Sequence, residues 1–126
     1  MSWKDTNRLK YGNKRARIAG SDRVYQSVRE ANDALWLRQL LAQGRIKEIK
    51  EQHRIRLVAY NEDGTKKHHF GDHIVDFLVT LNDGRQKYVE TKGFATREWK
   101  QFKKPLTELI SDIPYLVNPN EKTLLE

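Results

Sequence analysis

Residues 73–93 read HIVDFLVTLNDGRQKYVETKG, two apolar runs on either side of an Asn-Asp-Gly turn. Apolar runs joined by a turn of this kind are typical of a β-hairpin. We therefore expect one strand over residues 73–81 and a second strand over residues 85–92. The hairpin is the centre from which the rest of the fold can be worked out.

Three charged side chains interrupt these apolar runs. Because strand side chains alternate between faces, Glu90 and Lys92 should point the same way, and the hairpin can bring Asp76 alongside them. Two carboxylates beside an ammonium form a site for a hard divalent cation, with a group attached that transfers a proton or stabilises charge. The alternative is an ordinary solvated strand surface with salt-bridged side chains.

Helical and strand patterns flank the hairpin on both sides. Their order is α-β-β-β-α-(β), which predicts an α+β domain with a central antiparallel meander. The expected elements are a helix over 27–43, a strand over 46–60 with a bend near Glu51, a helix over 96–111 that Pro105 interrupts or restarts, and a short strand over 115–117.

Two further polar residues are candidates for the same site. Glu30 borders the apolar stripe of the first helix, so this helix could deliver a third carboxylate to the Asp76 and Glu90 pair. Alternatively, Ser27 and Glu30 match a capping box, in which Glu30 reaches back to the helix start. Gln52 on the long strand either positions a water at the site or is an ordinary strand residue.

Composition limits the class of protein. The chain has 126 residues, of which 37% are hydrophobic and 33% charged, and this size suits one domain with one core. It has no cysteine, which excludes disulfides, zinc–thiolate sites and thiol catalysis. No apolar run is long enough to span a membrane, so we expect a cytoplasmic protein that does not contact membranes.

The net charge of +7 is concentrated at the start of the chain. Seven lysines and arginines face two aspartates within residues 1–23, so we expect a basic segment over 1–22, before a single domain over 23–126. Either the basic segment and the last helix contact nucleic-acid phosphates, or they are solvated surfaces. The candidate contacts are Lys10, Lys14, Arg15, Arg17, Arg97, Lys100, Lys103 and Lys104.

The four histidines do not suggest a metal site. His68 and His69 are adjacent in a lysine-rich stretch that is typical of a solvated loop, and no two histidines lie four positions apart within an expected helix, as a helical metal pair would.

The order of these residues resembles the PD-(D/E)XK nuclease superfamily, and in particular its small phage and transposon members. The resemblance extends over about residues 10–110. It rests on the glutamate that ends YQSVRE (25–30), the aspartate of VDF (75–77), VETK (89–92) and the neighbouring ETKGF (90–94). The proline that often precedes the aspartate is replaced by Val75. The resemblance implies a restriction-endonuclease-like α/β core, a mixed sheet flanked by helices, with 115–117 as its fourth strand.

The resemblance also implies roles for the candidate residues. Asp76, Glu90 and the Thr91 carbonyl would bind Mg²⁺, for which Mn²⁺ would substitute, and Glu30 would complete the site directly or through water. Lys92 would orient or deprotonate the attacking water, or stabilise the charge on the phosphorane. The site would hold one or two metal ions.

The function expected from this resemblance is a metal-dependent DNA endonuclease encoded by a phage or mobile element and active in the cytoplasm of a bacterial host. A homodimer would suit cleavage of both strands. A separate targeting partner is a further possibility. The rival functions are a non-catalytic basic DNA-binding module and a phage assembly factor that uses the same fold.

Overall fold

A computed structural model describes residues 15–18, 24–65 and 67–126 of the chain. The chain divides into two compact units, Met1–Arg45 and Ile46–Glu126, which we describe separately. Within the described ranges, no helix has both the length and the apolar character needed to cross a membrane.

The first unit contains helix α2 (Val28–Ala42) and a small two-stranded sheet. Ser27 caps the helix, because its side chain accepts a hydrogen bond from the Glu30 N–H at 3.0 Å. Gly44, with a φ of 72°, follows the last turn, directly after residue 43, where the helix was expected to end. Strands β1 (Ala16–Arg17) and β2 (Val24–Tyr25) pair in an antiparallel arrangement that the sequence analysis did not predict.

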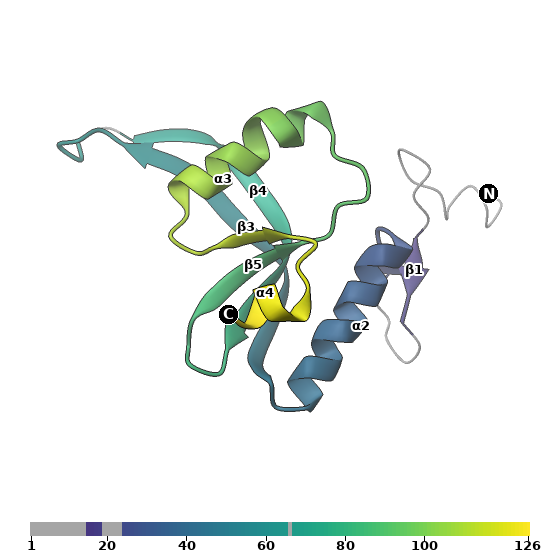
Figure 1. Ribbon diagram of the computed structural model, residues 1–126. Coiled ribbons are helices and arrows are strands. Elements are labelled where there is room, and N and C mark those ends of the chain that lie inside the picture. The colour runs from purple at the N-terminus through teal and green to yellow at the C-terminus, as the bar shows by residue number, and fades with distance from the viewer. Residues whose placement is uncertain (1–14, 19–23, 66) are drawn as a thin grey trace. The chain divides into compact units, whose positions relative to one another are not determined.

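The second unit is built on a four-stranded mixed sheet in the order β3-β4-β5-β6 (Figure 1). The first three strands are antiparallel and β6 is parallel to β5, so the expected meander is confirmed and the short fourth strand is present. The strands are β3 (Ile46–Tyr60), β4 (Lys67–Leu81), β5 (Gln86–Glu90) and β6 (Tyr115–Val117).

Two strands differ in their bounds from the sequence prediction, β4 (expected over 73–81) and β5 (expected over 85–92). β4 begins at Lys67, because the pairing with β3 continues from His73 out to the Tyr60–Lys67 pair. His68 and His69 are therefore exposed strand residues, and the prediction that they lie in a loop was wrong. β5 ends at Glu90, so Lys92 lies beyond the strand. Strand alternation therefore does not determine which way the Lys92 side chain points.

A π-helical turn, η2 (Trp99–Lys103), and helix α3 (Lys104–Ile110) connect β5 to β6. Pro105 lies in the first turn of α3. Proline lacks an N–H and is tolerated at this position, so it marks a restart of the helix, one of the two expected outcomes. Helix α4 (Glu121–Leu125) follows β6 and was not predicted. Asn120 caps α4 by accepting a hydrogen bond from the Thr123 N–H at 2.8 Å.

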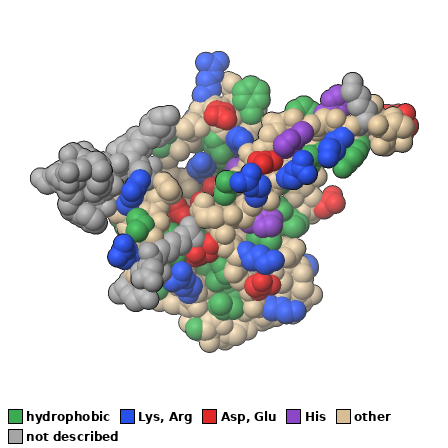
Figure 2. Space-filling view, turned by 180° about the vertical axis from the view of Figure 1, so that it is seen from behind, with side chains coloured by type: hydrophobic (Ala, Val, Ile, Leu, Met, Phe, Trp, Pro, Cys, Tyr) green, Lys and Arg blue, Asp and Glu red, His purple; other side chains and the backbone are tan. Residues whose placement is uncertain are grey.

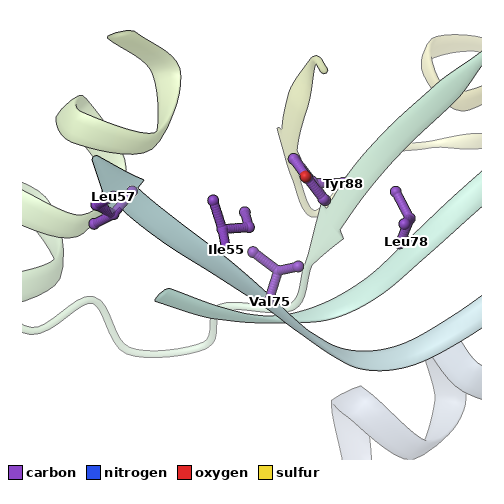
Figure 3. Close-up of a cluster of buried hydrophobic side chains, with 5 residues drawn as sticks. All are labelled: Ile55, Leu57, Val75, Leu78 and Tyr88. Carbon is purple, nitrogen blue, oxygen red and sulfur yellow. The ribbon is translucent and has the colours of Figure 1, made fainter. Parts of the chain in front are cut away.

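The core of the second unit lies between the sheet and α3. Figure 3 shows its centre, formed by Ile55, Leu57, Val75, Leu78 and Tyr88. Side chains from α3 and the segment after it, including Leu106 and Ile110, pack against this cluster. Strict alternation on β4 would put Val75 and Leu78 on opposite faces, yet one cluster contains both.

Candidate active site

Asp76 and Glu90 lie at the same level of the sheet, on β4 and β5. Phe77 on β4 pairs with Val89 on β5 in an antiparallel arrangement. Asp76 comes just before Phe77 and Glu90 just after Val89, so the two carboxylate residues lie opposite each other. Asp76 Oδ2 accepts a hydrogen bond from the Thr91 N–H at 2.7 Å. This bond ties the first carboxylate to the backbone next to the second one.

Glu90 is buried, with 4% of its surface exposed, and its carboxylate is held by two side chains. The Tyr115 hydroxyl on β6 donates to Glu90 Oε2 at 3.0 Å, and His73 Nε2 on β4 lies 3.3 Å from the same oxygen. Both contacts therefore use Oε2, which leaves Oε1 as the oxygen of Glu90 that could coordinate a cation.

The partners of Glu90 are themselves held in place. Trp99 Nε1–H donates to the Tyr115 hydroxyl at 3.0 Å, and His73 Nδ1 lies 2.7 Å from Thr107 Oγ1 on α3. Because Nε2 of His73 faces a carboxylate, it should carry the ring hydrogen, and Nδ1 then accepts from the Thr107 hydroxyl. We call this set of side chains the Glu90 network: His73, Glu90, Trp99, Thr107 and Tyr115.

Tyr115 is a fixed hydrogen-bond donor in this network. Burial raises the pKa of its hydroxyl far above the usual range, and the negative charge of Glu90 raises it further. The Asp76 carboxylate has an effect in the same direction, which indicates that both carboxylates lie near the hydroxyl. Tyr115 therefore stays protonated across the range in which proteins are folded.

Lys92 is fixed by its backbone, just beyond the end of β5. Its N–H donates to Asn118 Oδ1, and its carbonyl accepts from Asn118 Nδ2, both at 2.9 Å. Asn118 N–H also donates to the Glu90 carbonyl at 2.8 Å. The Lys92 ammonium lies 5.1 Å from the centre of the Trp99 ring, a cation–π arrangement that joins it to the Glu90 network.

Gln52 lies on β3 level with Asp76, between the residue pairs Glu51–Phe77 and His53–Val75. Its φ of 55° is unusual for a residue other than glycine, and Gln52 directly follows Glu51, where a bend of the strand was expected. A non-glycine residue in this conformation is strained, and such residues are often found at functional sites. The strand register supports the expectation that Gln52 borders the site.

Glu30 belongs to the first unit, whereas the other candidate residues belong to the second. It is buried, and its backbone N–H is bound by Ser27, so one half of the expected capping box is present. The convergence of Glu30 with Asp76 and Glu90 stays a prediction.

The donor set at this end of the sheet suits a hard cation. Asp76, Glu90 and the Thr91 carbonyl offer oxygen ligands of the kind that Mg²⁺ prefers. Among the described residues, no three His, Asp or Glu side chains form a group that could hold a metal ion. A complete site in the second unit would therefore need the Thr91 carbonyl and water as further ligands.

The cations expected to bind phosphate have different environments. Arg15, Arg17, Arg97 and Lys100 are exposed. Lys103 Nζ donates to the Asp72 carbonyl at 2.6 Å, and Lys104 forms an ion pair with Glu108. Lys10 and Lys14 lie outside the described residues.

His73, Trp99 and Tyr115 were not predicted from the sequence as site residues. They are separated by 16 to 42 positions from one another, and no periodic pattern links them. Only the parallel placement of β6 beside β5 brings Tyr115 to Glu90. An available signal was the position of His73, three residues before Asp76 on the same strand.

A family model matches residues 8–115 of the chain, and its description is "Protein of unknown function (DUF1064)". This chain belongs to the DUF1064 family. No curated protein and no solved structure matches the chain. The DUF1064 match includes Glu30, Asp76, Glu90, Lys92 and the whole Glu90 network.

Proposed function

We propose that this DUF1064 protein is a metal-dependent endonuclease that hydrolyses phosphodiester bonds in DNA. The observation that carries the proposal is the hydrogen bond from the Thr91 N–H to Asp76 Oδ2. This bond ties Asp76 on β4 to the backbone directly after Glu90 on β5. The Thr91 carbonyl is therefore near both carboxylate residues, and Lys92 is the next residue along the chain. This arrangement suits the PD-(D/E)XK resemblance.

The residues that would hold Mg²⁺ are Asp76, Glu90 and the Thr91 carbonyl, with Glu30 as a further ligand if the first unit supplies it. A bound Mg²⁺ would activate a water and relieve the charge on the leaving oxygen. Tyr115 and His73 would keep Glu90 Oε1 turned toward the cation by occupying Oε2.

Lys92 would act on the attacking water or on the charge that develops at phosphorus. Its ammonium lies over the Trp99 ring, within the same network as Glu90. The four-carbon stem of lysine can carry the amine to the substrate phosphate without a change in the backbone, which Asn118 holds.

The decisive experiment is cleavage of linear, nicked, branched and single-stranded DNA with Mg²⁺ and with Mn²⁺. Asp76→Asn and Lys92→Met should each abolish cleavage while DNA binding, measured by fluorescence anisotropy, is retained. Absence of cleavage by the parent protein on every substrate and with both ions would contradict the proposal.

A second candidate is a non-catalytic DNA-binding or assembly protein with the same fold. Two observations favour it. Glu90 already receives contacts from Tyr115 and His73, and the described residues contain no group of three His, Asp or Glu side chains that could hold a metal ion. Isothermal titration with Mn²⁺ separates the two, because the second candidate predicts no binding that depends on Asp76 and Glu90.

Several broader expectations also stay predictions. They are a homodimer, a targeting partner, an origin in a phage or mobile element, and a location in the cytoplasm of a bacterial host. Sedimentation with and without DNA would test the first.

A further inference from the structure

The β3–β4 hairpin continues beyond the rest of the sheet as a two-stranded ribbon, which we define as residues 54–60 and 67–74. β5 pairs with β4 only over residues 77–80, so the ribbon has no third strand among the described residues. In Figure 1 its tip projects past β5 and α3. A two-stranded hairpin has marginal stability in water, so the part of the ribbon that projects past α3 would be stabilised by a ligand bound to it.

The two faces of the ribbon differ. Ile55 and Leu57 point into the core beneath α3 and are buried. Their neighbours Arg54 and Arg56 are exposed. Toward the tip, large apolar side chains are exposed as well, with exposed fractions of 64% for Tyr60 and 56% for Phe70.

The charges of the ribbon favour an anionic ligand. Its one acidic residue, Asp72, is neutralised by Arg54 at 2.8 Å and by His69 at 2.9 Å, and these contacts hold its pKa below the usual range. Arg56 and Lys67 form no ion pair within the described part of the chain. Figure 2 shows Lys, Arg and His side chains along the ribbon.

The acidic residues Glu62 and Asp63 lie in the turn at the tip, outside the ribbon. Asp63 is occupied locally, because its Oδ1 accepts from both the N–H and the hydroxyl of Thr65. Arg54, Arg56 and Lys67 therefore lie on the strands of the ribbon, whereas the two acidic residues lie in the turn.

We propose that this ribbon enters the major groove of duplex DNA, with Arg56 and Lys67 on backbone phosphates and Tyr60 and Phe70 against the groove wall. The proposal rests on the proposed function in that it names the substrate of the same protein. The major groove of B-form DNA, about 12 Å wide, admits a two-stranded β-ribbon. Residues 54–60 span about 20 Å at roughly 3.3 Å per residue, close to six base-pair steps.

The same geometry predicts discrimination between DNA and RNA. The major groove of A-form RNA is deep and narrow and does not admit protein elements of this width. The ribbon should therefore favour duplex DNA over duplex RNA of the same sequence.

The experiment measures binding by fluorescence anisotropy in the Asp76→Asn background, in which DNA stays uncut. The double variant Arg56→Gln/Lys67→Gln is compared with Lys47→Gln/Lys122→Gln, which removes two exposed lysines away from the ribbon. The ribbon variant should bind duplex DNA at least tenfold more weakly. The slope of log K against log salt should fall by about 1.8, since each lost phosphate contact removes about 0.9. The control should retain both values.

A second variant, Tyr60→Ser/Phe70→Ser, should weaken binding while the salt slope stays the same, because it removes contacts that carry no charge. Unchanged affinity in the Arg56→Gln/Lys67→Gln variant would overturn the proposal. Equal ribbon-dependent binding to duplex RNA would overturn it too. So would self-association that depends on the ribbon with no effect on DNA binding, since the occupant would then be a second copy of the chain.

Cleavage assays of the protein with Asp76 intact separate this inference from the proposed function. If the parent protein binds DNA through the ribbon but never cuts it, the nuclease proposal fails and the ribbon proposal stands. If the parent protein cuts DNA and the ribbon variants cut and bind normally, the nuclease proposal stands and the ribbon proposal fails.

Discussion

The Glu90 network and the projecting ribbon both contain acidic side chains in contact with a histidine, but their surroundings are opposite. Glu90 and His73 have side chains only 5% and 7% exposed, whereas Asp72 and His69 on the ribbon are 26% and 41% exposed. A buried polar group that loses its partner costs free energy, because water cannot replace the bond. An exposed group exchanges partners readily. The network is therefore suited to fixing geometry, and the ribbon to meeting a ligand.

The largest effect should come from removing one charge at the proposed metal site. Asp76→Asn keeps an oxygen that can accept the Thr91 N–H bond but removes the negative charge that would hold a cation. We expect a loss of about 10³-fold in the rate of Mg²⁺-dependent DNA cleavage, the scale of an electrostatic group in an active site. Asp112→Asn, at an exposed aspartate, is the matched control. A variant that cleaves as fast as the control would remove Asp76 from the mechanism.

The next largest effect concerns the attachment of the ribbon to the core. Leu57 is 1% exposed and lies in the cluster beneath α3. Leu57→Ala should lower the free energy of unfolding by about 2–5 kcal/mol, because it leaves a cavity. Leu109→Ala, at a position 81% exposed, should change it by less than about 0.5 kcal/mol. Urea unfolding monitored by tryptophan fluorescence would measure both. Equal effects would mean that the ribbon base is not packed as described.

A smaller loss is expected when the Glu90 network loses one hydroxyl. Tyr115→Phe removes the bond to Glu90 and leaves the Trp99 N–H without its acceptor. We expect a decrease of about 1–3 kcal/mol in the free energy of unfolding and weaker binding of Mn²⁺. Tyr60→Phe, at the exposed tip of the ribbon, should change neither quantity. If both variants behave alike in calorimetry, the hydroxyl of Tyr115 has no positioning role.

The smallest effect is a shift in the pH dependence of the ribbon. Contacts with His69 and Arg54 lower the pKa of Asp72. A lowered pKa in the folded state means that the stabilisation is present above the unfolded value and is lost as pH falls through the folded value. In an NMR titration of the carboxyl carbon, His69→Ala should raise the Asp72 pKa. His68→Ala should leave it unchanged, and an equal response in both variants would show that the His69 contact does not form.

The local pattern of the sequence was sufficient to predict most of the second unit. The sequence between Ile46 and Tyr60 predicted β3 with its correct bounds, and Asn82-Asp83-Gly84 correctly placed the turn between β4 and β5. These elements depend on alternation and on turn chemistry, which act over a few residues. The extension of β4 to Lys67 could not be found in this way, because most of its residues are polar and become strand only by pairing with β3.

The carboxylates of the candidate site were predictable from the sequence, but the side chains that hold Glu90 in place were not. Asp76 and Glu90 stand out because charged residues in apolar strands conflict with strand propensity. Tyr115 reaches Glu90, and Thr107 reaches His73, only because the β5–β6 connection returns through α3 to a parallel strand. Such contacts depend on topology, which spacing along the chain does not encode. The convergence of Glu30 with these residues stays a prediction, because Glu30 belongs to the other unit.

Asn118 has a consequence for how Lys92 can be studied. Asn118 has a positive φ of 50°, and its side-chain amide forms hydrogen bonds with both the N–H and the carbonyl of Lys92. These two bonds continue the β5–β6 pairing by one residue, with a side chain in place of backbone. The backbone of Lys92 is thus held by Asn118 and not by its own side chain. Replacing its amine should leave the chain path intact. Any kinetic defect in Lys92→Met would then report the missing amine itself. Alkylation of Lys92→Cys with 2-bromoethylamine gives a side chain nearly isosteric with lysine, restores the amine and should recover the lost rate.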